Sequence, residues 1–208
     1  MAKPDNELTP MKRQYNAIKE QNQDCILFFR LGDFYEMFDD DAKTAARELD
    51  LTLTTRDRNK PKEEQTPMCG VPYHSVDSYI ARLVAKGYKV AICEQMEDPA
   101  AAKGIVERDI TRIVTPGTVT ESCMLDETKN NYMACLYGEG GRYGLAFCDV
   151  STGAFFATVC SDAAAAAGEL GRFSPAEVIL NTAAAEHGAL QAFLRERLHC
   201  HCERGRDA

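Results

Sequence analysis

One nonapeptide, Arg30-Leu31-Gly32-Asp33-Phe34-Tyr35-Glu36-Met37-Phe38, limits how the chain on either side of it can fold. Residues 25–29 before it are continuously apolar, which is typical of a strand covered on both faces. Residues 40–49 after it begin with acidic side chains and continue with alanines and a leucine at helical spacing. A strand, a glycine with two aromatics, and a helix in this order indicate an α/β fold with an unusual junction.

The composition is that of an ordinary globular protein. The chain has 208 residues, of which 45% are hydrophobic and 27% charged. This length allows one large domain or two small ones. No apolar run approaches the roughly 20 residues that a membrane span needs, and the N-terminus lacks the apolar core of a secretory signal. We therefore expect a cytoplasmic protein without a membrane partner.

The nine cysteines do not form a recognisable framework. Their number is odd, they are scattered, and no Cys-x-x-Cys pair occurs, so neither disulfides nor a zinc ribbon is expected. Most lie in apolar runs, where a free cysteine behaves as a small hydrophobe. The run His199-Cys200-His201-Cys202 has the residue types of a metal site. In a frayed terminus its alternate spacing would chelate poorly, so we expect no metal centre.

The charge distribution limits the possible partners. A formal net charge of −8 excludes a protein that coats nucleic acid by bulk attraction. Residues 1–115 contain 17 Lys and Arg against 20 Asp and Glu, whereas residues 116–208 contain 7 against 12. Any contact with a polyanion must therefore be local. The most basic stretch, residues 55–62, is either a solvated hairpin loop or a loop that contacts phosphates.

Residues 1–116 are predicted to form a first α/β domain with a mixed sheet. The expected helices lie at about 10–21, 40–49 and 76–86, with a short one beginning at Asp98-Pro99. The expected strands lie at about 25–31, 51–54, 89–93 and 108–114. Residues 67–74, which include two prolines and a glycine, are predicted to be a rigid, turn-rich connector.

The second part of the chain has a different pattern. Residues 117–130 are polar and weakly patterned, as in a linker. Three strands joined by Gly-rich turns then predict an antiparallel meander, followed by a helix at 163–173, a strand at 177–180 and a helix at 186–198. This order predicts a ribonuclease-H-like C-terminal domain over residues 131–208. We expect that domain to be truncated, because such a sheet would need further strands after residue 200.

Catalysis has one candidate residue. Asp149 begins Asp149-Val150-Ser151-Thr152-Gly153, which is similar to the acidic strand of nucleases on this type of sheet. A metal-dependent nuclease of ribonuclease-H type is therefore the alternative function. Two-metal chemistry needs several converging carboxylates, and the neighbouring predicted strands supply none. The chain also lacks a Gly-x-x-x-x-Gly-Lys-Ser/Thr phosphate loop. We expect no enzyme activity, no catalytic residue and no cofactor within this chain.

A binding function has a better candidate in Phe34 and Glu36. An aromatic ring and a carboxylate two residues apart can stack on a base and hydrogen-bond to it. The competing interpretation is ordinary packing, with the phenylalanine in the core and the glutamate in the first turn of a helix.

The stretch from Phe28 to Phe38 closely resembles the Phe-x-Glu mismatch-reading motif of the MutS family of DNA mismatch repair sensors. The likeness covers essentially residues 8–180 in order. It continues through Leu49-Asp50-Leu51-Thr52-Leu53-Thr54, Pro67-Met68-Cys69-Gly70-Val71-Pro72-Tyr73-His74, Ala91-Ile92-Cys93-Glu94-Gln95 and Arg112-Ile113-Val114-Thr115-Pro116-Gly117-Thr118. It implies a mismatch-recognition domain followed by most of a connector domain, without the family's clamp, lever and ATPase regions.

The resemblance also implies roles for individual residues. Phe34 would wedge into the minor groove and stack on one base of a mispair, and Glu36 would hydrogen-bond the edge of that base. Arg56, Arg58 and Met68 would be the next candidates for backbone and groove contact. The implied partners are mismatched double-stranded DNA, MutL at the connector domain, and a second copy of the full-length protein. ATP and Mg²⁺ are expected only in the full-length protein. A pure protein-interaction fragment remains the third interpretation.

Overall fold

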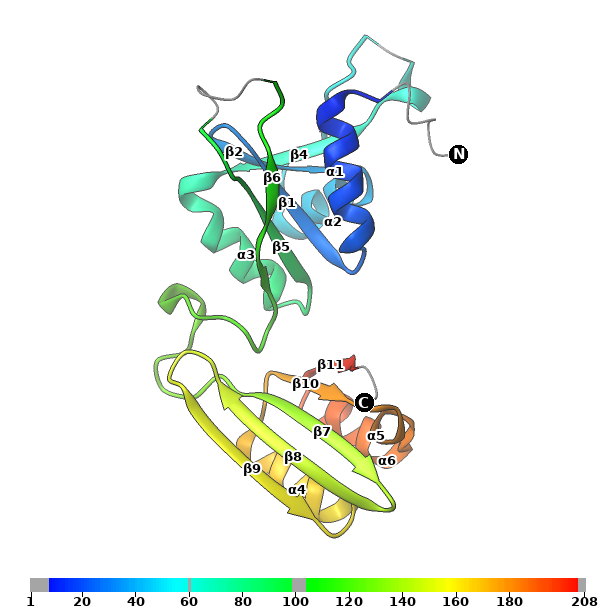
Figure 1. The fold of residues 1–208 in the computed structure, drawn as a ribbon, viewed down its shortest axis with the longest axis vertical. Coiled ribbons are helices and arrows are strands. Elements are labelled where there is room, and N and C mark those ends of the chain that lie inside the picture. The colour runs from blue at the N-terminus through cyan, green and yellow to red at the C-terminus, as the bar shows by residue number, and fades with distance from the viewer. Residues whose placement is uncertain (1–7, 60, 99–103, 206–208) are drawn as a thin grey trace. The chain divides into compact units, whose positions relative to one another are not determined.

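The chain folds as two compact units, each with one β-sheet and packed helices (Figure 1). The computed structural model describes residues 8–59, 61–98 and 104–205. The boundary between the units falls between Val114 and Thr115. The predicted α/β class with two sheets is confirmed.

The first unit contains a six-stranded mixed sheet in the order β3-β4-β2-β1-β5-β6. Only β1 and β5 are parallel, and the other neighbouring pairs are antiparallel. The strands are β1 (Cys25–Leu31), β2 (Phe34–Phe38), β3 (Thr54–Thr55), β4 (Pro67–Pro72), β5 (Lys89–Gln95) and β6 (Arg108–Val114). The helices are α1 (Pro10–Gln21), α2 (Asp39–Leu49) and α3 (Val76–Val84), with 3-10 turns at Lys62–Glu64 and Tyr73–Ser75.

The helices begin and pack for local reasons. Thr9 caps α1 by accepting a hydrogen bond from the Lys12 N–H, and Pro10 follows at the first helical position. Tyr15 of α1 packs edge-on against Phe29 and Phe38, so α1 covers one face of the sheet. On the other face, α2 and α3 pack against the remaining side chains of the central strands.

The nonapeptide itself is a β-hairpin rather than a direct strand-to-helix junction. Strands β1 and β2 are joined by the two residues Gly32 and Asp33, so Leu31 pairs with Phe34. Gly32 has a φ of +59°, as the first central residue of a type II′ turn requires. Strand β2 ends at Phe38, immediately before α2, so Glu36 lies in a strand and not in the first turn of a helix.

The prediction of a turn-rich connector over residues 67–74 was wrong, because most of that segment is strand β4. It pairs with β2, so that Gly70 lies opposite Glu36. Cys69 and Val71 are buried on one face. Pro67 and Pro72 stand at the two ends of the strand, where a missing N–H is tolerated. The prolines concealed the strand pattern in the sequence.

Two other expectations for this unit changed. The strand expected at 51–54 is reduced to the two residues of β3. The short helix expected from Asp98-Pro99 lies mostly outside the described residues.

The second unit contains a five-stranded sheet in the order β11-β10-β7-β8-β9. Strands β7, β8 and β9 form the predicted antiparallel meander. Strand β10 pairs in parallel with β7, and β11 pairs in parallel with β10. The strands are β7 (Met133–Glu139), β8 (Arg142–Asp149), β9 (Ala154–Cys160), β10 (Glu177–Leu180) and β11 (His201–Arg204). The helices are α4 (Ala163–Phe173), α5 (Thr182–Glu186) and α6 (Gly188–Ala192), and a 3-10 turn spans Ser122–Met124.

The C-terminal predictions need two corrections. The helix expected at 186–198 is present as α6 and the π-helical turn Phe193–Arg197 that continues it, but it begins at Gly188 and is separate from α5, which ends at Glu186. His187 separates the two helices and caps α6 through its ring nitrogen. The frayed terminus expected at 199–202 was also wrong, because His201 begins β11 and pairs with Glu177. Of the helices in the described ranges, none has the length and apolar character needed to cross a membrane.

Candidate functional site

Phe34 is the first residue of β2 and lies at the end of the sheet face that α1 covers. The alternation of β2 places Phe34, Glu36 and Phe38 on one face. Phe38 packs under α1 and is 2% exposed, whereas Phe34 lies beyond the helix and is 47% exposed. The ring is thus held on a buried hairpin but is not part of the cluster around Tyr15 and Phe38 on the same face, which disfavours the packing interpretation for this residue.

Glu36 lies between the exposed Phe34 and the buried Phe38. Its side chain is 22% exposed, and Arg56 Nη1 is 3.7 Å from its Oε2. That oxygen is buried and accepts no hydrogen bond from any described residue. Burial raises the pKa of Glu36, and the positive charge of Arg56 opposes this effect only in part. The carboxyl group is therefore poised to take up a proton or a hydrogen-bonding partner.

Gly70 of β4 lies between Phe34 and Glu36. A Cβ at this position would be 3.5 Å from Glu36 Cγ, 3.8 Å from Phe34 Cδ1 and 3.2 Å from the Tyr35 carbonyl oxygen. The contact with the Tyr35 carbonyl oxygen would be tight, and the contacts with Glu36 and Phe34 would be ordinary van der Waals contacts. Sequence analysis did not single out Gly70, because only the β2–β4 register places it there.

Arg30 holds the turn that carries Phe34. Its Nε donates to the Gly32 carbonyl, its guanidinium lies 3.9 Å from the centre of the Tyr73 ring, and it approaches Glu94 to 3.7 Å. The Tyr73 N–H donates to the Asp33 carbonyl across the turn at 3.0 Å. Sequence analysis also missed this set. The only feature in the sequence that pointed to these contacts was Arg30 itself, a charged residue at the end of an apolar strand.

Glu94 and Tyr35 extend this set below the turn. The Tyr35 hydroxyl donates to Glu94. Burial, followed by the contact with Glu94, raises the pKa of Tyr35 to about 12, so the phenol stays protonated. The turn end of the hairpin is therefore linked to β5 by side chains as well as through the sheet.

The other three predicted contact residues lie at different depths. Arg56 follows β3, has a side chain that is 54% exposed, and reaches Glu36 as described. Arg58 lies in the following turn and is exposed. Met68 of β4 is half-buried and packs against the cluster around Tyr15 and Phe38. The structure therefore brings Arg56 close to Glu36, while Met68 contributes mainly to packing.

The raised pKa of Glu36 predicts a pH-dependent effect on stability. Ionised Glu36 is penalised in the folded state, so its contribution favours folding at low pH and is lost as pH rises through the folded pKa. Glu36→Gln should therefore raise the midpoint of thermal unfolding at neutral pH, and the gain should shrink as pH falls and vanish well below the unfolded pKa of ~4.3, where the carboxyl is protonated in both states. Thermal unfolding of both proteins across this pH range checks the prediction. Glu20→Gln, an exposed change on α1, should show no such trend.

Asp149, the candidate nuclease residue, is fully buried at the end of β8. Its Oδ1 accepts from the N–H and Oγ of Ser151 and from the Thr152 N–H, and its Oδ2 accepts from Asn130 Nδ2 and the Asn131 N–H. Burial opposes ionisation, but these hydrogen bonds outweigh it and lower the pKa of Asp149 to about 2.

The geometry around Asp149 does not support the nuclease alternative. A cavity of about 390 Å³ adjoins the residue, but both carboxylate oxygens are occupied by capping hydrogen bonds. Within the described residues, the metal-type cluster of acidic and imidazole side chains does not include Asp149. The Asp-x-Ser-Thr-Gly stretch is a turn in which Ser151 and Thr152 donate hydrogen bonds to the Asp149 carboxylate.

Two family models match successive parts of the chain. The family model for MutS domain I matches residues 9–123, and the model for MutS domain II matches residues 131–204. The DNA mismatch repair protein MutS of Ruminiclostridium cellulolyticum is 54% identical over 195 residues, which are 92% of this chain and 22% of that protein.

Two further relatives match a slightly shorter part of the chain. The MutS proteins of Acetivibrio thermocellus and Clostridium tetani are each 59% identical, over 177 and 175 residues, which are 84% of this chain and 20% of each relative. The chain therefore spans about a fifth of the length of these relatives. With its sheets, its Phe-x-Glu hairpin and both domain matches, the chain belongs to the MutS family.

Proposed function

We propose that this chain is the mismatch-reading part of a DNA mismatch repair sensor and that its first unit probes base pairs with Phe34 and Glu36. The observation that carries the proposal is the pairing of an exposed ring with a partly buried carboxyl on one face of β2. This pairing occurs in a chain that matches both family domains.

Phe34 would act as a wedge that tests how easily a duplex deforms. Inserting an apolar ring at a base step costs a few kcal/mol of unstacking, and the cost is smallest where pairing is already weak. Stacking of the ring on a base returns about 1–3 kcal/mol. The balance favours binding at a mispair of any sequence, which is a readout of deformability rather than of base identity.

Glu36 would add a penalty against intact duplex. An ionised carboxylate inside a groove lined with phosphates is repelled, which adds to the burial that already raises its pKa. In its protonated form Glu36 can donate a hydrogen bond to a purine nitrogen of the displaced base. The side chain is 22% exposed, so the carboxyl can make this contact by turning its unpaired Oε2 outward from its buried position.

Because the chain has a net charge of −8, it cannot attract DNA as a whole, and Arg56 and Arg58 would supply local contacts with phosphates instead. Arg56 would also shift between Glu36 and the DNA backbone, since it is 3.7 Å from the carboxylate in this structure. Met68 would support the groove-facing surface from beneath Phe38 rather than reach the groove itself.

Glu36→Gln tests this function directly. The substitution keeps the shape of the side chain and removes the ionisable proton, so binding to paired duplex should strengthen or stay unchanged while discrimination falls. The measurement is the dissociation constant for two duplexes of the same sequence, one fully paired and one with a single mispair, at fixed salt. The ratio of the two constants gives the discrimination. Lowering the pH should strengthen binding of paired duplex to the wild type and not to the variant. An equal loss of affinity for both duplexes would refute the assigned role.

The second unit would serve as a connector in the longer protein. Its strand order, a meander with two parallel strands added beside the first strand, supports a ribonuclease-H-like assignment. We further propose that MutL contacts this unit, that the full-length protein is a homodimer gripping the DNA, and that ATP and Mg²⁺ act in regions beyond this chain. This chain itself would bind and not catalyse.

A further inference from the structure

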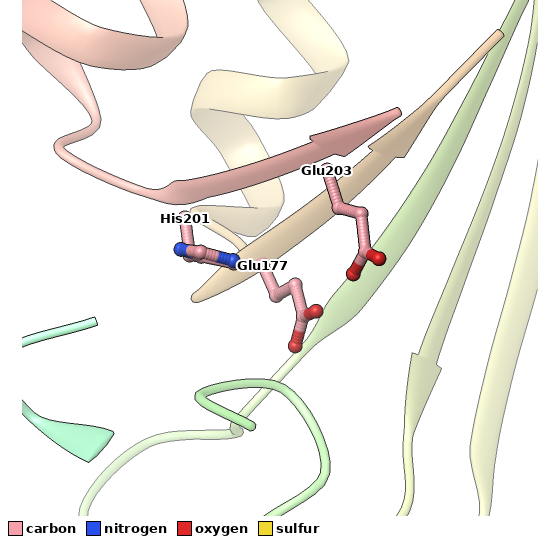
Figure 2. A group of neighbouring side chains, drawn as sticks. All are labelled: Glu177, His201 and Glu203. Atoms are coloured by element: carbon pink, nitrogen blue, oxygen red, sulfur yellow. The ribbon is translucent and has the colours of Figure 1, made fainter. Parts of the chain in front are cut away.

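Three side chains from β10 and β11 converge in the second unit: Glu177, His201 and Glu203. One ligand atom from each lies within 4.8 Å of the other two. His201 pairs with Glu177 and Glu203 pairs with Ile179, so the alternation of the two strands places all three side chains on one face. Figure 2 shows them projecting to the same side of the strand pair.

The two cysteines of the C-terminal run lie on the core side of β11, opposite the face that carries His201. Cys200 and Cys202 pack against the core of the second unit, with their sulfur atoms 3.8 Å apart. The run therefore does not act as one four-residue chelate. Instead, one of its histidines joins two glutamates, one of them 24 positions earlier in the sequence.

Glu177 is the most buried member of the group. It is 2% exposed, and its Oε2 accepts from Thr115 Oγ1 at 2.5 Å and from the Gly117 N–H at 2.9 Å. A Cβ at Gly117 would lie 3.0 Å from that oxygen, so the turn fits closely around the carboxylate. Hydrogen bonds to a ligand's outer oxygen are how proteins orient carboxylates at metal centres.

Charge is the second, independent observation. Within the described residues, neither Glu177 nor His201 forms an ion pair. Burying the Glu177 carboxylate without a neighbouring positive charge is costly, and a cation bound by the cluster would supply that charge. His201 and Glu203 each offer a further ligand atom within the same small volume, which suits a metal cation.

We propose that Glu177, His201 and Glu203 bind one divalent transition-metal cation of the Mn²⁺ or Zn²⁺ type. Two carboxylate oxygens and one imidazole suit such ions better than Mg²⁺, which prefers oxygen ligands and water. Water would complete the coordination. The bound ion would fasten β11 to β10 and, through Glu177, to the turn at Thr115–Gly117, which begins the second unit. The site is structural and independent of the mismatch-reading function.

Mn²⁺ is the probe for the test, because thiolates such as Cys200 and Cys202 can capture Zn²⁺ but bind Mn²⁺ weakly. The chelator-treated chain should bind one equivalent of Mn²⁺, measured by the loss of the free-ion electron paramagnetic resonance signal. The ion should raise the midpoint of thermal unfolding, and Mg²⁺ at the same concentration should not.

Two substitutions test the ligands. Losing even a residue behind a metal ligand costs about 10–100-fold in affinity, so Glu203→Gln and His201→Ala should each weaken Mn²⁺ binding by at least about 10-fold. Glu177 is not substituted, since it also holds the Thr115–Gly117 turn. His199→Asn is the matched control, because residue 199 has a φ of +51°, which asparagine tolerates, and lies outside the cluster.

The outcomes separate clearly. Stoichiometric binding that both ligand variants weaken and the control does not supports the site. Absence of Mn²⁺ binding to the folded wild type, or equal binding by wild type and both ligand variants, overturns it. Thermal unfolding of each variant without metal shows whether a loss of binding reflects a loss of folding. Glu203→Gln, an isosteric change on an edge strand, keeps the test interpretable if His201→Ala does not fold.

Discussion

Phe34→Ala should remove most of the preference for mispaired DNA while the first unit stays folded. The ring is 47% exposed and lies outside the cluster around Tyr15 and Phe38, so we expect its loss to leave no buried cavity. Stacking worth about 1–3 kcal/mol would be lost only where a base can be engaged. Affinity for a mispaired duplex should therefore fall by about 5- to 150-fold, with little change for a paired duplex.

The measurement is a pair of dissociation constants at fixed salt, made in the longer protein that we propose this chain belongs to. Phe155→Ala is the matched control: it makes the same chemical change at a ring that is 65% exposed on β9 of the second unit. The control should leave both affinities unchanged. If Phe34→Ala unfolded the chain, or weakened both duplexes equally, the ring would be a packing residue and the wedge would be refuted.

Asp149→Ala should destabilise the second unit strongly, because it removes the acceptor for five hydrogen bonds at a fully buried position. Each buried donor left unsatisfied costs about 1–3 kcal/mol, and water entering from the adjoining cavity recovers part of that. We expect a net loss of about 2–4 kcal/mol in the free energy of unfolding. Urea unfolding followed by circular dichroism measures it.

The pH dependence provides an independent check on Asp149. Its pKa is lowered to about 2 in the folded chain, against about 3.9 when unfolded. A lowered carboxyl pKa stabilises the folded state above the unfolded value, and that contribution is lost as pH falls through the folded pKa. The difference between wild type and Asp149→Ala should therefore shrink between pH ~4 and pH ~2. Glu139→Ala, at the exposed end of β7, should show no comparable change.

The same variant separates the capping role from catalysis. Under the capping account, Asp149→Ala changes the stability of the protein and no Mg²⁺-dependent cleavage of hybrid or nicked substrates is seen with either protein. A folded Asp149→Ala protein of unchanged stability that had lost a measurable cleavage activity would instead restore the nuclease alternative.

Local patterns were reliable where a segment carries its own periodicity. The apolar run of β1, the capped helix α1 and the meander β7-β8-β9 all appeared near their predicted bounds. Prediction failed where Pro, Gly and His interrupt the pattern. Two prolines concealed β4, whose pairing with β2 a local pattern does not contain. His187 caps α6, so the last helix begins at Gly188, two residues later than predicted.

By itself the sequence determined the α/β class and the Phe-x-Glu pair, whereas the strand β2 that puts both side chains on one face appeared only in the structure. Only the tertiary structure decided what lies opposite them. Strand register places Gly70 beneath Phe34 and Glu36, and it places His201 beside Glu177. Register depends on which strands meet and how they align, and a shift of one residue would turn every one of these side chains to the other face. The long-range partners of each site were therefore invisible until the sheets were formed.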